Sequence, residues 1–168
     1  ENETSYYHKS IGGYHAAKLR RYQEMIEAYI SPEMQSLMSA VVKAGGDMTK
    51  VNGDSIYPVL NMLNTKSFIL PLQNNQTVPL QNPYTFGNAW LVDKITYVDN
   101  ANAELDAVGK INLKHEAVAD MRFKAALGES KTQGNLAKAE ITQYAPNRLT
   151  YHVESDKGGV LVFSEIYY

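Results

Sequence analysis

The strongest pattern in this sequence is an amphipathic helix, predicted from Tyr14 to Ile30 after Gly12 and Gly13. Its apolar residues recur every three or four positions and form one stripe that we expect to be buried: Leu19, Tyr22, Ile26 and Tyr29. Charged residues occupy the opposite side. A helix of this kind needs other elements to cover its stripe, so the sequence predicts a packed domain.

A second helix is predicted directly after the first. Ser31 can cap it, Pro32 suits a first helical position, Glu33 complements the helix dipole, and Gly45-Gly46 suits a helix end. Its apolar face comprises Met34, Leu37, Met38, Val41 and Val42. Together the two helices predict a helical hairpin.

Shorter elements are predicted further along the chain. Pro58 opens a short helix, and Asn100 and Gly109 mark the start and the end of another. Apolar and β-branched residues predict strands at 66–72, 89–98 and 116–121. Residues 73–86 are rich in Asn, Gln and Pro, which predicts a loop.

The C-terminal residues predict an antiparallel β meander after a linker at 128–135. One turn at 145–147 pairs Ile141 with Tyr151 and Gln143 with Leu149. The next turn, at 156–159, pairs two further sets of residues: Leu149 with Ile166, and Val153 with Val162.

The fold class that follows is α+β. We expect an N-terminal helical hairpin packed with a mixed sheet, followed by an antiparallel β meander that begins a β-sandwich. The parts would span residues 1–127 and 128–168, or form a single compact domain.

Composition narrows the possible functions. The 168 residues are 44% hydrophobic, which suits one domain, and a net charge of −2 argues against a nucleic-acid partner. The lack of cysteine excludes disulfides and thiolate chemistry. No run approaches the roughly 20 apolar residues that span a bilayer. The absence of an initiator methionine predicts that the chain begins inside a larger protein or after processing.

Several segments, in order along the chain, have a specific residue order: Ser5–Ile30 with its Gly-Gly-Tyr-His and Lys-Leu-Arg-Arg-Tyr-Gln runs, Tyr57–Lys66, Asn82-Pro83, Gly87–Val92 and Phe163–Tyr168. In these segments the chain resembles the YfhO family of bacterial multi-spanning membrane proteins. In that family these segments belong to a large extracytoplasmic region that follows many transmembrane helices. The family is similar to C-type membrane glycosyltransferases, which take a sugar from a polyprenyl-phosphate carrier.

The resemblance implies a non-catalytic role for this chain, because the family's acidic catalytic residues are expected in early loops between membrane spans. We therefore expect an extracytoplasmic domain that assists cell-envelope glycosylation by positioning a lipid-linked sugar or an acceptor. Its partners would be the transmembrane part of the same polypeptide and a polyprenyl-phosphate sugar or envelope glycan. No cofactor is expected.

One candidate ligand site is a basic cluster around Gly12-Gly13 and the predicted helix start. The cluster comprises Lys9, His15, Lys18, Arg20 and Arg21, and a helix start with cations suits a phosphate. The alternative is that these charges are solvated or paired with Glu24 and Glu27.

Trp90 is the second candidate, because tryptophan can stack on a sugar ring, although packing in the core is the alternative role of an aromatic residue. A metal site is not predicted, since the histidine spacing is poor. The predicted pairing of Glu140 with His152 is typical of cross-strand ion pairs.

Two other functions stay open beside the accessory domain. A carbohydrate-binding or protein-interaction module would act at the envelope without a transferase. A hydrolase would need two carboxylates across a sugar, and Asp93 with Asp99 or Glu104 with Asp106 are the candidate pairs. Each of these acids also has a plain structural role in a strand edge, a turn or a helix start.

Overall fold

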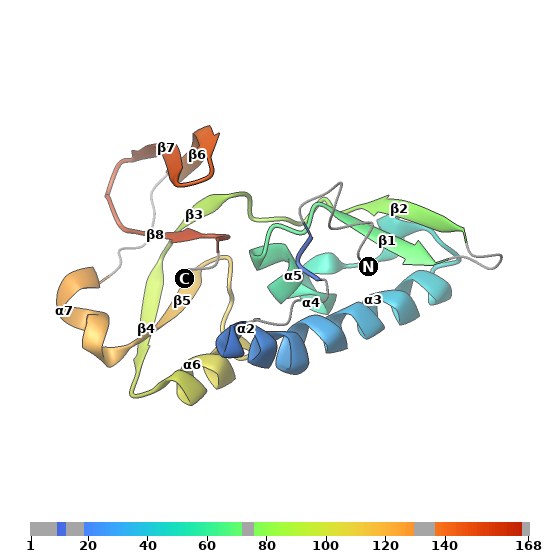
Figure 1. Ribbon diagram of the computed structural model, residues 1–168, viewed down its shortest axis with the longest axis horizontal. Coiled ribbons are helices and arrows are strands. Elements are labelled where there is room, and N and C mark those ends of the chain that lie inside the picture. The colour runs from blue at the N-terminus through green and yellow to red at the C-terminus, as the bar shows by residue number, and fades with distance from the viewer. Residues whose placement is uncertain (1–9, 13–18, 72–75, 130–136, 166–168) are drawn as a thin grey trace. The chain divides into compact units, whose positions relative to one another are not determined.

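The computed structural model describes residues 10–12, 19–71, 76–129 and 137–165 (Figure 1). The fold is α+β, as predicted. The chain forms two compact units, Glu1–Pro83 and Tyr84–Tyr168. The division predicted at 127/128 lies within the second of these units.

The described elements of the first unit run from a long helix to a β hairpin. Its elements are α2 (Arg20–Met25), the π-helix η1 (Ile26–Ile30), α3 (Ser31–Lys43), the 3-10 helix η2 (Met48–Lys50), α4 (Gly53–Ile56), α5 (Pro58–Met62), β1 (Ser67–Pro71) and β2 (Thr77–Gln81). The predicted helix start at Tyr14 lies outside the described residues. Leu19 has an extended backbone with ψ of 131°, so the described helix begins at Arg20.

The predicted helical hairpin is wrong, because α2, η1 and α3 run as one continuous helix through Pro32 (Figure 1). A proline inside a helix removes one backbone hydrogen bond, and its ring meets the carbonyl four residues back. Here the preceding turn is a π turn, in which the N–H of Ser31 donates to the carbonyl of Ile26. The wider turn accommodates the proline ring without ending the helix.

Gly45 and Gly46 end this helix, as predicted. Both have positive φ, 63° and 85°, which glycine adopts without steric cost. Their N–H groups donate to the carbonyls of Val42 at 3.1 Å and Val41 at 2.9 Å.

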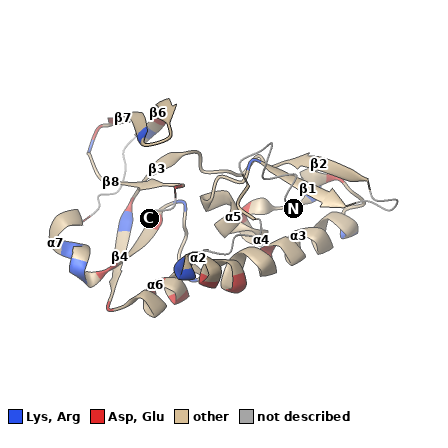
Figure 2. Cartoon of the chain, viewed as in Figure 1, with Lys and Arg blue, Asp and Glu red and all other residues tan. Residues whose placement is uncertain are grey.

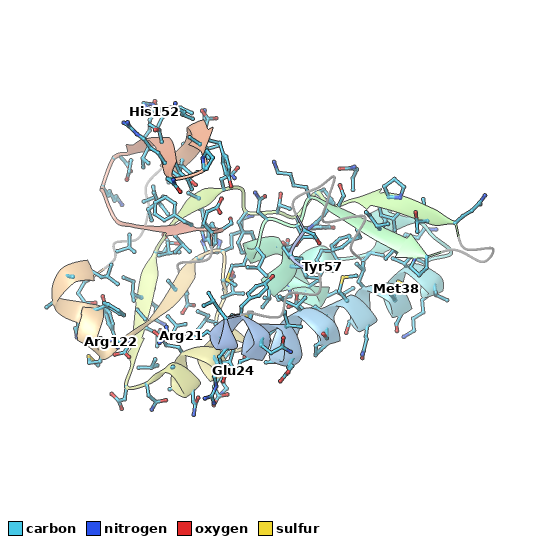
Figure 3. All side chains as sticks on the ribbon, viewed as in Figure 1. Arg21, Glu24, Met38, Tyr57, Arg122 and His152 are labelled. Carbon is cyan, nitrogen blue, oxygen red and sulfur yellow. The ribbon has the colours of Figure 1, made fainter. Side chains whose placement is uncertain are left out.

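The core of the first unit gathers around α5, which begins at Pro58 as predicted. Leu37 of α3 and Leu60 of α5 are fully buried, and the ring of Tyr57 meets Phe68 of β1 edge-on at 5.2 Å (Figure 3). Phe68 and Leu70 point inward while their neighbours on β1 are exposed.

Strand β2 was predicted as part of a loop, and that prediction is wrong. It pairs antiparallel with β1, from Ser67 opposite Gln81 to Pro71 opposite Thr77. Pro79 lies within it and lacks the N–H that a central strand requires. A ribbon of two strands has two free edges, so a proline can lie in such a strand.

Glu33 is a buried charged residue of the first unit. Its carboxylate accepts hydrogen bonds from the N–H groups of Val59 and Leu60, each at 2.9 Å, in the first turn of α5. The residue is 8% exposed. Burial raises the pKa of Glu33 above its ordinary value, and the two backbone hydrogen bonds offset part of that rise.

In the residues that the structure describes, the second unit contains three pairs of strands, two α-helices and a 3-10 helix. Its elements are β3 (Ala89–Val92), β4 (Lys94–Val98), α6 (Ala101–Val108), β5 (Glu116–Asp120), the 3-10 helix η3 (Met121–Phe123), α7 (Lys124–Leu127), β6 (Ala137–Ala145), β7 (Arg148–Ser155) and β8 (Val160–Phe163). The cap predicted for α6 is confirmed, since Asn100 Oδ1 accepts from Ala103 N at 3.0 Å. The strand predicted at 89–98 divides at Asp93 into β3 and β4.

Strands β4 and β5 pair in parallel, and α6 connects them. Such a connection requires a crossover, which α6 and the turn after it supply. Strand β3 pairs antiparallel with β8, and β6 pairs antiparallel with β7.

The first hairpin of the predicted meander is present with part of its register changed, and the predicted third strand is wrong. Ile141 lies opposite Tyr151 as predicted, but a register shift after Ile141 places Tyr144, not Gln143, opposite Leu149. Strand β8 pairs with β3, so Val162 lies opposite Trp90 and not opposite Val153. Ile166 lies outside the described residues.

Replacing Glu33 with Gln should lower the free energy of unfolding by about 1–3 kcal/mol at neutral pH, because the amide NH₂ of Gln would face a backbone donor in a buried site. Denaturant unfolding of the 168-residue chain, followed by circular dichroism, measures this change. The control is Glu27→Gln on the exposed side of the same helix. Equal stability of the two variants would contradict the structural role of Glu33.

The same variant tests the raised pKa. A raised pKa means that the folded state holds a proton more tightly than the unfolded state, so the contribution of Glu33 to stability falls as pH rises from 4.5 through the folded pKa. The stability difference between the original chain and Glu33→Gln should therefore shrink over that rise. If the stability difference widened instead, the hydrogen bonds would lower the pKa of Glu33 by more than burial raises it.

Candidate functional site

The basic cluster lies only partly within the described residues. Lys9, His15 and Lys18 fall outside them. Arg20, at the start of α2, pairs with Glu24 one turn later, with Nε and Oε1 at 2.9 Å, as the ion-pairing alternative expects. Arg21 is exposed (Figure 3). Figure 2 shows basic residues at the start of this helix and acidic residues after them.

Trp90 lies on β3, in the second unit, and is half-buried. Its indole Nε1 donates to the carbonyl of Leu113 at 3.2 Å. The ring of Phe86 meets the indole edge-on, with the centroids 5.2 Å apart and the planes at 69°. Because the indole N–H is already bonded, a ligand at Trp90 would contact the ring and not its polar atom.

The carbonyl that accepts from Trp90 belongs to Leu113, in a tight turn at residues 112–115. The carbonyl of Asn112 accepts from His115 N at 2.9 Å and from Glu116 N at 2.7 Å. Asn112 Oδ1 accepts from Lys114 N at 3.2 Å. These bonds fix the backbone of the turn from within.

The same turn is tied to the end of β3. The carbonyl of His115 accepts from the N–H groups of Asp93 at 2.7 Å and Lys94 at 3.2 Å. Trp90 and Asp93 therefore hold the turn at two points, Leu113 and His115. We call the region of Phe86, Trp90, Asp93 and the turn 112–115 the Trp90 surface.

Asp93 also orients the His115 side chain. Its Oδ2 lies 2.8 Å from His115 Nδ1. An ionised carboxylate only accepts hydrogen bonds, so we assign the proton to Nδ1. This leaves Nε2 available to a ligand, on a side chain that is 57% exposed.

The polar groups of the Trp90 surface include an Asp–His pair, Asp93 with His115. Among the residues that the structure describes, no three His, Cys, Asp or Glu side chains gather as a metal site. The chemistry present is an aromatic ring beside fixed polar groups.

The carboxylates on the β6–β7 hairpin are in cross-strand or near-neighbour pairs. Glu140 lies opposite His152, as predicted. His152 Nε2 contacts Glu154 Oε1 at 3.0 Å, and this bond lowers the pKa of Glu154 (Figure 3). Lys138 Nζ contacts Glu140 Oε1 at 2.9 Å. These exposed pairs explain the charges of the hairpin without a catalytic role.

The sequence named Trp90 as a candidate but did not predict which residues would surround it. Asp93 and His115 are 22 residues apart, and no spacing rule connects them. Asn112 could have been noticed as a turn residue, since its side chain bonds to the backbone two residues later. Nothing in the sequence pattern showed which strand that turn would meet.

Comparison with known proteins finds no match to this chain: no family model, no curated protein and no solved structure matches it. The resemblance to the YfhO family therefore stays a prediction. None of the helices in the described ranges is long and apolar enough to cross a membrane.

Proposed function

We propose that this chain is a non-catalytic, extracytoplasmic, glycan-binding domain of a YfhO-like membrane protein. It positions a lipid-linked sugar or an acceptor polymer during cell-envelope glycosylation, while another part of the protein carries out the transfer. The Trp90 surface is the observation that carries the proposal.

The chemistry of that surface supports glycan binding. A sugar ring has an apolar C–H face and a rim of hydroxyl groups, so it suits an aromatic ring flanked by fixed polar groups. Trp90 with Phe86 supplies the aromatic part. His115, held by Asp93, supplies a polar atom on a side chain with little freedom to move.

The sequence resemblance supports an extracytoplasmic location for glycan binding. Trp90 lies within Gly87–Val92, one of the segments that resemble the YfhO family. That resemblance also implies that the sugar comes from a polyprenyl-phosphate carrier and that the acidic catalytic residues belong to another part of the polypeptide.

Glycan binding can be measured through Trp90 itself, because it is the only tryptophan in the chain. Titration with envelope glycans or a short-chain polyprenyl-phosphate sugar should change its fluorescence. Calorimetry of Trp90→Leu should show binding reduced at least about tenfold, as expected for a lost aromatic contact of about 1.4 kcal/mol. The control Tyr144→Leu removes an exposed aromatic ring of β6 and should bind normally.

Location can be tested with a single cysteine, since the chain has none. Lys157→Cys lies in the exposed turn after β7. In a full-length protein otherwise free of cysteine, a membrane-impermeant maleimide should label it in intact cells. Labelling that appears only after lysis would reject the extracytoplasmic location.

A protein-interaction module is the second candidate, and one exposed apolar segment favours it. Met121, Phe123 and Leu127, on η3 and α7, are 45%, 47% and 41% exposed. The guanidinium of Arg122 lies over the Phe123 ring, 4.9 Å from its centroid (Figure 3). Apolar side chains that gather on a protein surface often mark a contact with a partner.

This candidate predicts that Phe123→Asp weakens association with the transmembrane part of the same polypeptide. Co-purification of the two parts, expressed as separate chains, measures that association. The matched control is Val153→Asp, which places the same charge at an exposed apolar position of β7. Equal loss in both variants would show a general effect of the added charge and not a contact at η3–α7.

A further inference from the structure

The segment that enters the Trp90 surface is basic. Residues 109–115 contain Lys110, Lys114 and His115 and no acid. The neighbouring acids are already paired, Asp93 with His115 and Glu116 with Lys94. In the described part of the chain, Lys110 and Lys114 are exposed and form no ion pair. Lys114 is therefore an exposed lysine next in sequence to Leu113, whose carbonyl accepts from Trp90.

Lys114 has a fixed backbone and a free side chain. Its N–H donates to Asn112 Oδ1, and the residues on either side are tied down at Leu113 and His115. The Cα of Lys114 is thus held one residue from the carbonyl to which the indole is bonded. Its ammonium group can approach a ligand that contacts the indole ring.

His115 adds a second polar group at the same place. With Nδ1 donating to Asp93, Nε2 is the ring atom left to accept a hydrogen bond from a ligand.

We propose that the Trp90 surface selects glycans that carry an anionic group, a carboxylate or a phosphate. The sugar ring contacts Trp90, the anionic oxygens contact Lys114 Nζ, and a sugar hydroxyl donates to His115 Nε2. This inference rests on the proposed glycan binding and names the class of ligand. Because Lys114 is exposed, salt should weaken the charge contribution.

The test compares matched ligands by Trp90 fluorescence and calorimetry. An oligogalacturonate and its fully methyl-esterified form differ in the carboxylate charge and the ester methyl, and a hexose 1-phosphate and the free hexose differ in the phosphate. Inorganic phosphate tests whether the anion suffices without a sugar. We expect each anionic sugar that binds to do so about tenfold more tightly than its neutral form, as for one charge-assisted hydrogen bond.

Lys114→Glu should remove the preference for the anionic sugars. Lys157→Glu makes the same change in net charge at another exposed lysine and should keep the preference. Circular dichroism confirms that both variants fold. Comparison of the oligogalacturonate with the hexose 1-phosphate shows whether the preferred anionic group is a carboxylate or a phosphate.

Equal affinity for anionic and neutral sugars would overturn the charge selection and leave glycan binding intact. No response to any sugar would overturn both proposals. Binding of inorganic phosphate as tight as that of hexose 1-phosphate would also overturn this inference, because the sugar ring would then add nothing.

Discussion

The first unit depends on the buried carboxylate of Glu33. Burying a charge is costly unless hydrogen bonds compensate it. Both oxygens of Glu33 bind N–H groups in the first turn of α5, a helix whose N-cap residue, Tyr57, supplies no side-chain cap. Glu33 of the long helix therefore supplies the hydrogen-bond acceptors for N–H groups in the first turn of α5, which has no side-chain cap of its own. Asn61 continues the polar chain, since its Nδ2 donates to Gly53 O at 3.0 Å and its Oδ1 accepts from Asn82 at 2.9 Å.

Local signals predicted the ends of elements well, and long-range contacts explain the errors. Asn100 and Gly45-Gly46 act within a few residues of their own position, so their effect can be recognised in the sequence. Pro32 carries the same kind of signal, yet the π turn before it keeps the helix continuous. Glu33 suited the dipole of its own helix, but its oxygens bind residues 26 and 27 positions away. No local rule distinguishes these two uses of an acid.

Strand partners were predicted less well than the strands themselves. The apolar run of β8 fits any strand with a compatible apolar face, and the sequence alone favoured its neighbour β7. In the structure β8 pairs with β3, whose ends Ala89 and Val92 are buried. Tyr151 of β7 still contacts Phe163 of β8 through their rings, with centroids 4.9 Å apart. The predicted neighbours thus meet through side chains, without the backbone pairing that was expected.

The Trp90 surface follows from that change of partner, because β3 is held by β8 on one edge and continues into Asp93, which ties down the turn 112–115. The turn is held by main-chain groups, by Asn112 and by Trp90 and Asp93, and none of these bonds uses the side chain of Lys114. A charge change at Lys114 therefore leaves the frame of the turn intact. Any change in ligand preference that follows reports on the ligand's charge and not on the fold, which is why this residue separates recognition from stability.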